Sequence, residues 1–167
     1  MDDKTWLGAV AEARVVAELL ARRWEVFTAT TGKTAFDLVA SRGRDLVRIE
    51  VKGCATRQPS GGFAVSLRSI RSNRTRNVVR YLSEDRSDVV AIYLQPVDAV
   101  CFFPTVALSG RNSITLHEVG APGRLRHLIS DYATLGDGAV AEWTKATALK
   151  VVDPQGSVGS NPTRSAS

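Results

Sequence analysis

The segment 46–53 restricts the fold more than any other part of the chain, because apolar and charged residues alternate in it from Val47 to Lys52. Alternation with a period of two is typical of a strand that buries one face and exposes the other. The apolar face would consist of Val47, Ile49 and Val51, and the charged face of Arg48, Glu50 and Lys52. A turn sequence at 42–45 separates this strand from a second strand pattern at 36–41. Two strands joined by so tight a turn must be antiparallel neighbours in a hairpin.

This hairpin is expected to gather three reactive side chains. Asp37 lies near the start of the first strand and Glu50 near the end of the second, so antiparallel pairing brings them to the same end. Lys52 shares the face of Glu50. Asp37, Glu50 and the carbonyl of Val51 are oxygen ligands of the type that hard divalent cations prefer. Lys52 can then serve an attacking water and stabilise charge on a phosphate.

The alternative for this segment is a surface hairpin with a solvated Glu–Lys pair. Such a pair contributes on the order of a few tenths of a kcal/mol. A Glu-x-Lys sequence alone does not separate the two interpretations, because alternating charged strands are common. The acid on the preceding strand makes the catalytic interpretation the stronger one.

A helix is predicted at 5–23, where Ala, Leu, Val and Glu are frequent and Pro is absent. Glu12 falls among the apolar residues of its core face, four after Gly8 and four before Val16. A carboxylate at such a place needs a partner or a function. The alternative is a solvated acid on the helix surface.

The remaining pattern predicts an α/β domain over 1–136. Strands are expected at 25–30, 63–67, 88–94 and 99–103, with an edge strand at 113–118. The segment 69–85 is expected to be a loop that leads into a short helix near 77–82. The chain shows no internal repeat.

Positive charge is concentrated in the middle of the chain. The net charge is +5, but the window 42–86 holds eleven basic and four acidic residues, so it carries +7 and the rest −2. A localised cationic segment favours a nucleic-acid partner. The predicted phosphate and DNA contacts are Arg57, Gln58, Arg68, Arg71, Arg74, Arg76 and Arg80, interleaved with Ser66, Ser69, Ser72, Asn73 and Asn77. The alternative is a solvated, Arg-rich surface.

Several classes of protein are disfavoured. No apolar run reaches the length of a membrane span, and the acidic start lacks the features of a signal peptide, so a cytoplasmic protein is expected. Cys54 and Cys101 have no CxxC spacing and are expected to be buried free thiols. The sequence contains neither a Gly-rich phosphate loop nor a Gly-x-Ser-x-Gly motif.

The motifs together resemble the PD-(D/E)xK nuclease superfamily, near its Holliday-junction-resolvase and group I intron homing-endonuclease branch. The resemblance covers 6–108, and the matching residues are Glu12, Asp37 and Glu50-Val51-Lys52. One departure is Phe36, which stands where the motif has Pro. The resemblance implies a restriction-endonuclease-like fold, in which an N-terminal helix precedes a mixed central β-sheet flanked by helices.

The resemblance also implies an activity. Glu12, Asp37, Glu50 and Lys52 would be catalytic, with Asp37, Glu50 and Val51 holding Mg²⁺ or Mn²⁺. The expected protein is a Mg²⁺-dependent endonuclease that hydrolyses duplex or branched DNA as a homo-oligomer and is encoded by a mobile element or intron. The alternative is a catalytically inactive module on the same fold that binds DNA or RNA.

Residues 137–167 are expected to form a tail with little regular structure, because Ala, Thr, Ser, Gly and Pro dominate it without periodicity. Residues 159–162 can be read from codons that resemble the T-arm of tRNA genes, and 141–145 from codons that resemble a D-arm. We hypothesise that the reading frame runs into a tRNA gene, which would leave the tail without a selected fold. The alternative is an ordinary disordered tail.

Overall fold

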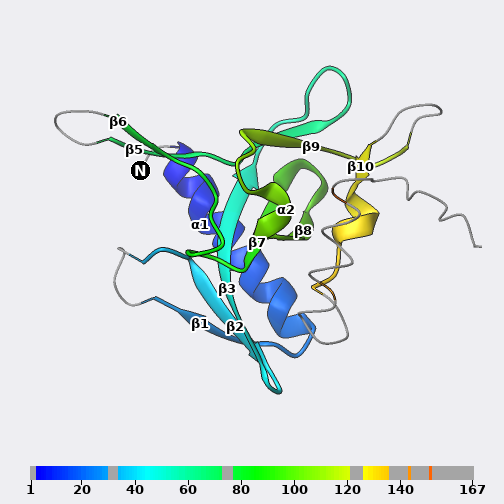
Figure 1. Cartoon of the computed structure of the whole chain (residues 1–167). Coiled ribbons are helices and arrows are strands. Elements are labelled where there is room, and N and C mark those ends of the chain that lie inside the picture. Colours follow the sequence, from blue (N-terminus) through cyan, green and yellow to red (C-terminus); the bar gives the residue numbers. More distant parts are fainter. Residues whose placement is uncertain are drawn as a thin grey trace, which may run out of the picture.

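The structure is a computed structural model that describes residues 3–29, 34–72, 77–120, 126–135, 143 and 151 (Figure 1). Its elements in chain order are α1 (Asp3–Ala21), β1 (Glu25–Thr28), β2 (Leu38–Arg42), β3 (Asp45–Cys54), β4 (Phe63–Ser66), β5 (Ser69–Ser72), β6 (Asn77–Arg80), β7 (Val89–Leu94), η1 (Gln95–Val97), β8 (Ala99–Pro104), α2 (Thr105–Leu108), β9 (Ser113–His117), β10 (His127–Leu128) and η2 (Ile129–Tyr132). The hairpin predicted at 36–53 is present as β2 and β3.

The central sheet has the strand order β1-β2-β3-β7-β8. Its strands pair antiparallel except for β3 and β7, which run parallel, so the sheet is mixed. Ile49 occupies the middle of the sheet, between Leu38 on β2 and Val89 on β7. The chain leaves β3 and returns to the sheet at β7, and the intervening strands β4, β5 and β6 belong to smaller sheets.

Helix α1 covers one face of this sheet (Figure 1). Its buried residues Ala11, Val15 and Leu19 are spaced by four and therefore form one stripe. They pack in one cluster with Val47 and Ile49, the apolar face of β3. The charged residues of β3 consequently lie on the opposite face of the sheet.

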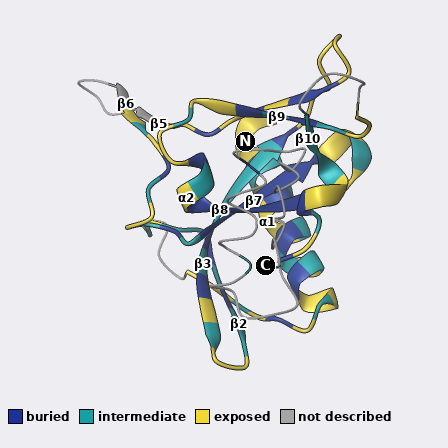
Figure 2. Cartoon of the chain, turned by 45° about the vertical axis from the view of Figure 1, so that its right-hand side comes forward, coloured by how far each residue is buried: buried dark blue, intermediate teal, exposed yellow. Residues whose placement is uncertain are grey.

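A second apolar cluster fills part of that opposite face. Every residue of β7 is buried, because both faces of this central strand are covered (Figure 2). The second face is covered by the small sheet β10-β9-β4 together with the short helix α2. The predicted α/β fold with an N-terminal helix and a mixed sheet is confirmed, although a small sheet takes much of the place expected for flanking helices.

Two predicted elements differ in the structure. The segment expected to be a loop and a short helix forms instead an antiparallel ribbon of β5 and β6, in which Ile70 pairs with Val79. A four-residue segment with only one or two apolar residues has no decisive periodicity, and here the pairing with a second strand decides its conformation. The strand predicted at the edge, now β9, lies between β4 and β10.

The smaller predictions have mixed outcomes. Cys54 and Cys101 are buried free thiols, as predicted. No helix among the described residues is long and apolar enough to cross a membrane. Most of 137–167 lies outside the described residues, so the tail and the domain boundary stay predictions. Within that segment, Trp143 packs against the α1 cluster and Val151 is buried in the second cluster.

Candidate active site

Asp37 is fixed at the end of the β2–β3 hairpin by two hydrogen bonds. Its backbone N–H donates to the carbonyl of Ile49 at 2.9 Å, which continues the strand pairing one residue beyond β2. Its Oδ2 accepts a hydrogen bond of 2.7 Å from the backbone N–H of Val51. The side chain therefore lies against the Glu-x-Lys segment of β3, as the sequence predicted.

Glu50 and Lys52 form an ion pair on the same strand. The Nζ of Lys52 lies 2.5 Å from Oε1 of Glu50, and each side chain is only 14% exposed. The Nζ also donates to Oγ of Ser69 at 2.9 Å, and this hydroxyl lies 3.4 Å from the same oxygen of Glu50. Such low exposure separates this pair from the solvated surface pair that was the alternative interpretation.

The pKa of Asp37 is raised above its ordinary value. Burial raises the pKa of Asp37, and the negative charge of Glu50 raises it further. The hydrogen bond from Val51 and the positive charges of Lys52 and Arg86 lower the pKa, but they do not cancel the increase. Arg86 is a residue that the sequence did not single out, and it acts on Asp37 from the turn before β7.

Glu12 approaches this group from α1. The residue as a whole is exposed, so it lies beside the core face of the helix, and partial burial of its carboxyl and the charge of Asp37 raise its pKa. Gly53 allows the helix to lie close to β3, because a Cβ at that position would be 3.0 Å from Cγ of Leu7. Glu12 is therefore within electrostatic reach of Asp37.

Comparisons with known proteins identify the family of the chain. The family model of the PD-(D/E)XK endonucleases matches residues 1–130. The chain belongs to the PD-(D/E)XK endonuclease family. A solved structure of a bacterial homing endonuclease, I-Ssp6803I, resembles the fold with a TM-score of 0.66 and 18% sequence identity. The match covers 93% of this chain and 100% of that one. The comparison with curated proteins gave no match.

The donor set of this PD-(D/E)XK endonuclease fits a hard cation. No group of three or more His, Cys, Asp or Glu side chains converges among the described residues. The oxygen donors that could hold a cation on the hairpin are the carboxylates of Asp37 and Glu50 and the carbonyl of Val51. All three supply oxygen, which Mg²⁺ prefers. Burial first, and the charge of Glu50 second, raise the pKa of Asp37, and a bound cation would favour the ionised carboxylate.

The predicted nucleic-acid contacts are distributed over two regions. Arg68 is exposed just before β5, and Arg80 pairs with Ser69 at the base of the β5–β6 ribbon. Directly opposite residues share a face of a ribbon, so Arg80 lies on the side of Ser69. Arg71 is on β5, whereas Arg74 and Arg76 lie outside the described residues.

Arg57 and Gln58 lie in the turn between β3 and β4. Arg57 forms an ion pair with Glu118, and its guanidinium lies 5.1 Å from the centre of the Phe63 ring. The backbone N–H of Gln58 donates to the carbonyl of Gly62 at 2.8 Å. The interactions of Arg57 are thus made with β4 and the end of β9, and none of them joins it to the Asp37 group.

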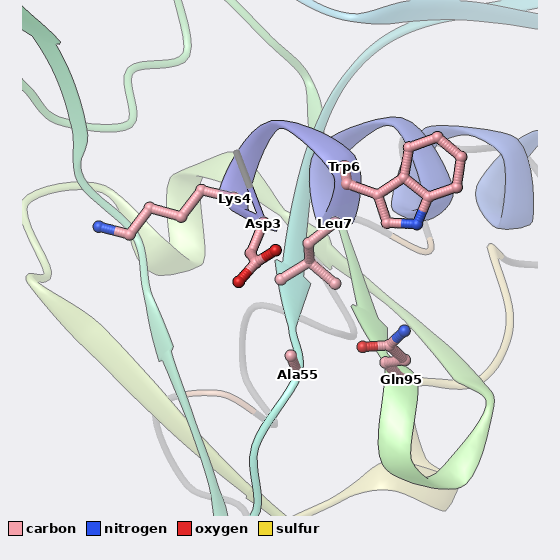
Figure 3. A pocket seen from close by; sticks show the side chains of 6 residues that line it. All are labelled: Asp3, Lys4, Trp6, Leu7, Ala55 and Gln95. Atoms are coloured by element: carbon pink, nitrogen blue, oxygen red, sulfur yellow. The ribbon is translucent and has the colours of Figure 1, made fainter. Parts of the chain in front are cut away.

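A hollow lies near the start of α1, with a volume of about 350 Å³ (Figure 3). It is lined by Asp3, Lys4, Trp6, Leu7, Ala55 and Gln95. Its lining is mainly apolar and includes none of the predicted catalytic residues. The candidate active site is therefore distinct from this hollow.

Proposed function

We propose that this protein is a metal-dependent endonuclease that hydrolyses phosphodiester bonds in DNA. The observation that carries the proposal is the convergence of Asp37, Glu50 and Lys52 on the β2–β3 hairpin, with the carboxylate of Asp37 hydrogen-bonded to the backbone of Val51. Membership of the PD-(D/E)XK endonuclease family supports the nuclease activity. The choice of DNA and of a divalent metal is our inference.

Each side chain has a defined task in the proposed reaction. Asp37 and Glu50 would hold the cation together with the carbonyl of Val51. A bound divalent cation acts as a Lewis acid on the scissile phosphate. Lys52 places an ammonium where it can guide the attacking water and stabilise charge on the phosphate. Glu12, close enough for its pKa to respond to Asp37, would assist at the same centre.

The nucleic-acid contact is proposed for the β5–β6 ribbon and its approach. Arg68 and Arg80 flank Ser69, which touches Lys52, so phosphate-binding charge lies beside the proposed catalytic group. A two-stranded ribbon is narrow enough to enter a DNA groove. Arg57, Gln58, Arg71, Arg74 and Arg76 complete the proposed contacts.

Two further features belong to the proposal. Cutting both strands of a duplex requires two active sites, so we expect a homo-oligomer. The likeness to a homing endonuclease supports an origin in a mobile element or intron, and the hypothesis that the reading frame runs into a tRNA gene agrees with it.

A second candidate function is a nucleic-acid-binding module without catalysis. The 2.5 Å ion pair between Glu50 and Lys52 favours it, because this carboxylate oxygen is already engaged by an ammonium. Metal binding separates the two candidates. An active site should bind Mn²⁺ in a titration, and the binding should weaken in Asp37→Ala, whereas a pure binder should bind no metal in either form.

The deciding experiment is cleavage of linear, branched and single-stranded DNA, and of RNA, with Mg²⁺ or with EDTA. We expect Mg²⁺-dependent cleavage of DNA that Asp37→Ala, Glu50→Ala and Lys52→Ala each abolish while folding and most DNA binding persist. Glu25→Gln, which changes an exposed carboxylate on β1, is the matched control and should cleave normally. Full cleavage by Glu50→Ala would refute the assignment.

A further inference from the structure

Ser69 occupies an unusual position, because it belongs both to the ribbon and to the active site. It is the first residue of β5, where the ribbon leaves the body of the molecule (Figure 1). Its hydroxyl accepts a hydrogen bond of 2.9 Å from Nζ of Lys52 and lies 3.4 Å from Oε1 of Glu50. Three polar groups from two separate elements therefore meet at one point.

The ammonium of Lys52 needs such a partner. Lysine carries its charge on a flexible four-carbon stem, so a single contact leaves the ammonium free to move around that contact. Glu50 supplies one contact, but in the proposed function this carboxylate also binds the cation. Cation and ammonium would then share its oxygens. The neutral hydroxyl of Ser69 attracts a metal ion less strongly than a carboxylate does, and it stays available to Lys52.

We propose that Ser69 is a positioning residue that holds the Lys52 ammonium in its working place. The inference rests on the proposed function for its catalytic consequence, since Lys52 must serve the reaction for its position to matter. The hydrogen bond itself is independent of that function. Ser69 also places this support on the DNA-binding ribbon, next to Arg80 on the paired strand.

The kinetic test compares Ser69→Ala with Ser69→Thr. Ser69→Ala removes the hydroxyl and should lower kcat by about 10- to 100-fold with little change in KM, because a displaced catalytic group slows chemistry rather than binding. Ser69→Thr retains the hydroxyl and suits a strand, so it should recover most of the rate. Ser113→Ala, at an exposed serine of β9, is the matched control and should behave as wild type.

A second measurement needs neither metal nor DNA. The ¹⁵N order parameter of the Lys52 ammonium should fall in Ser69→Ala and remain at the wild-type value in Ser69→Thr and Ser113→Ala. An unchanged order parameter in Ser69→Ala, or equal rates for Ser69→Ala and wild type, overturns the inference. If no substrate is cleaved by wild type but the order parameter falls as expected, then the proposed function fails while the positioning contact stands.

Discussion

Arg48 and Lys52 lie on the same face of β3, and each binds a carboxylate, but the surroundings of the two pairs differ. Arg48 binds Asp88 through its guanidinium at 2.7 and 3.1 Å and through its backbone N–H at 2.8 Å. Burial acts to raise the pKa of Asp88, but the bonds from Arg48 outweigh it and the pKa is lowered. This acid is therefore stabilised in its charged form.

In the group around Lys52 the acid, Asp37, has a pKa that is shifted in the opposite direction. The pKa of Asp37 is raised, because burial and the neighbouring Glu50 exceed the stabilisation from Val51, Lys52 and Arg86. The hydrogen bonds and charge of Arg48 thus outweigh the burial of Asp88, whereas the interactions of Asp37 do not outweigh its burial. A perturbed carboxylate pKa is typical of functional sites, and the two ends of one strand face differ in this respect.

The Arg48–Asp88 pair also helps to position the group around Asp37. The guanidinium of Arg48 donates to the backbone carbonyls of Glu84 and Asp85 at 3.0 and 2.8 Å. These residues immediately precede Arg86, whose charge lowers the pKa of Asp37. The hydrogen bonds of Arg48 therefore stabilise the turn that places the guanidinium of Arg86 near Asp37.

The largest contrast is expected in the cleavage rates of two variants, in which either Lys52 or Arg48 is replaced by Met. Lys52→Met, like Lys52→Ala, should abolish detectable cleavage, a loss of at least about 10²- to 10³-fold, because it removes a charge that acts on the transition state. Arg48→Met should retain the rate within about tenfold, because it acts only through the turn. Single-turnover cleavage of a DNA duplex, with circular dichroism to verify folding, makes this comparison. Equal losses in the two variants would show that the comparison between the pairs is wrong.

The hairpin could be predicted from sequence because its information is local. Strict alternation fixes which residues of β3 share a face, and the turn at 42–45 fixes the pairing with β2. Together these place Asp37 beside the Glu-x-Lys segment without knowledge of the rest of the fold. The structure agrees with this placement, because the backbone N–H of Val51 donates a 2.7 Å hydrogen bond to Asp37.

The features that the sequence did not predict depend on contacts between segments that are distant in the chain. Ser69 meets Lys52 from 17 residues away, and the sequence marked it only as one of several side chains suited to phosphate. Arg86 reaches Asp37 because β7 returns beside β3, a pairing that no local pattern specifies. The β5–β6 ribbon was predicted wrongly for the same reason, since β6 is a strand because it pairs with β5, in a register that sets Val79 opposite Ile70.

A smaller effect is expected in thermal stability. An acid whose pKa is raised in the folded state contributes stability below its unfolded pKa and loses it as the pH rises through the folded value. Ionised Asp37 therefore costs stability at pH 7, and Asp37→Asn should raise Tm by about 2–4 °C, the shift expected for roughly 1 kcal/mol in a chain of this size. Mg²⁺ should raise the Tm of wild type but not that of Asp37→Asn.

The control for this experiment is Glu25→Gln, which removes an exposed carboxylate of β1 and should leave Tm nearly unchanged. A scan at pH 3, where Asp37 is protonated in both folded and unfolded chains, should remove most of the difference between Asp37→Asn and wild type. A lower Tm for Asp37→Asn at pH 7 would mean that this acid is structural, like Asp88.

The smallest effect is expected at Asp88, with the opposite sign. An acid whose pKa is lowered contributes stability above its unfolded pKa and loses it as the pH falls through the folded value. The side chains of Arg48 and Asp88 are 33% and 40% exposed, so solvent screening limits the loss in Asp88→Asn to about 1 kcal/mol at pH 7. Urea unfolding should show this loss shrink below the ordinary pKa of 3.8.

The two acids, which directly precede the strands on either side of β3, should therefore give opposite pH slopes of stability. Replacing Asp37 should increase stability most at neutral pH, and replacing Asp88 should decrease stability most there. Both differences from wild type should vanish in acid. Slopes of the same sign would mean that Asp37, like Asp88, is fully compensated by its neighbours. The argument for a cation at this site would then lose its electrostatic basis, although the cleavage assay would still test the activity directly.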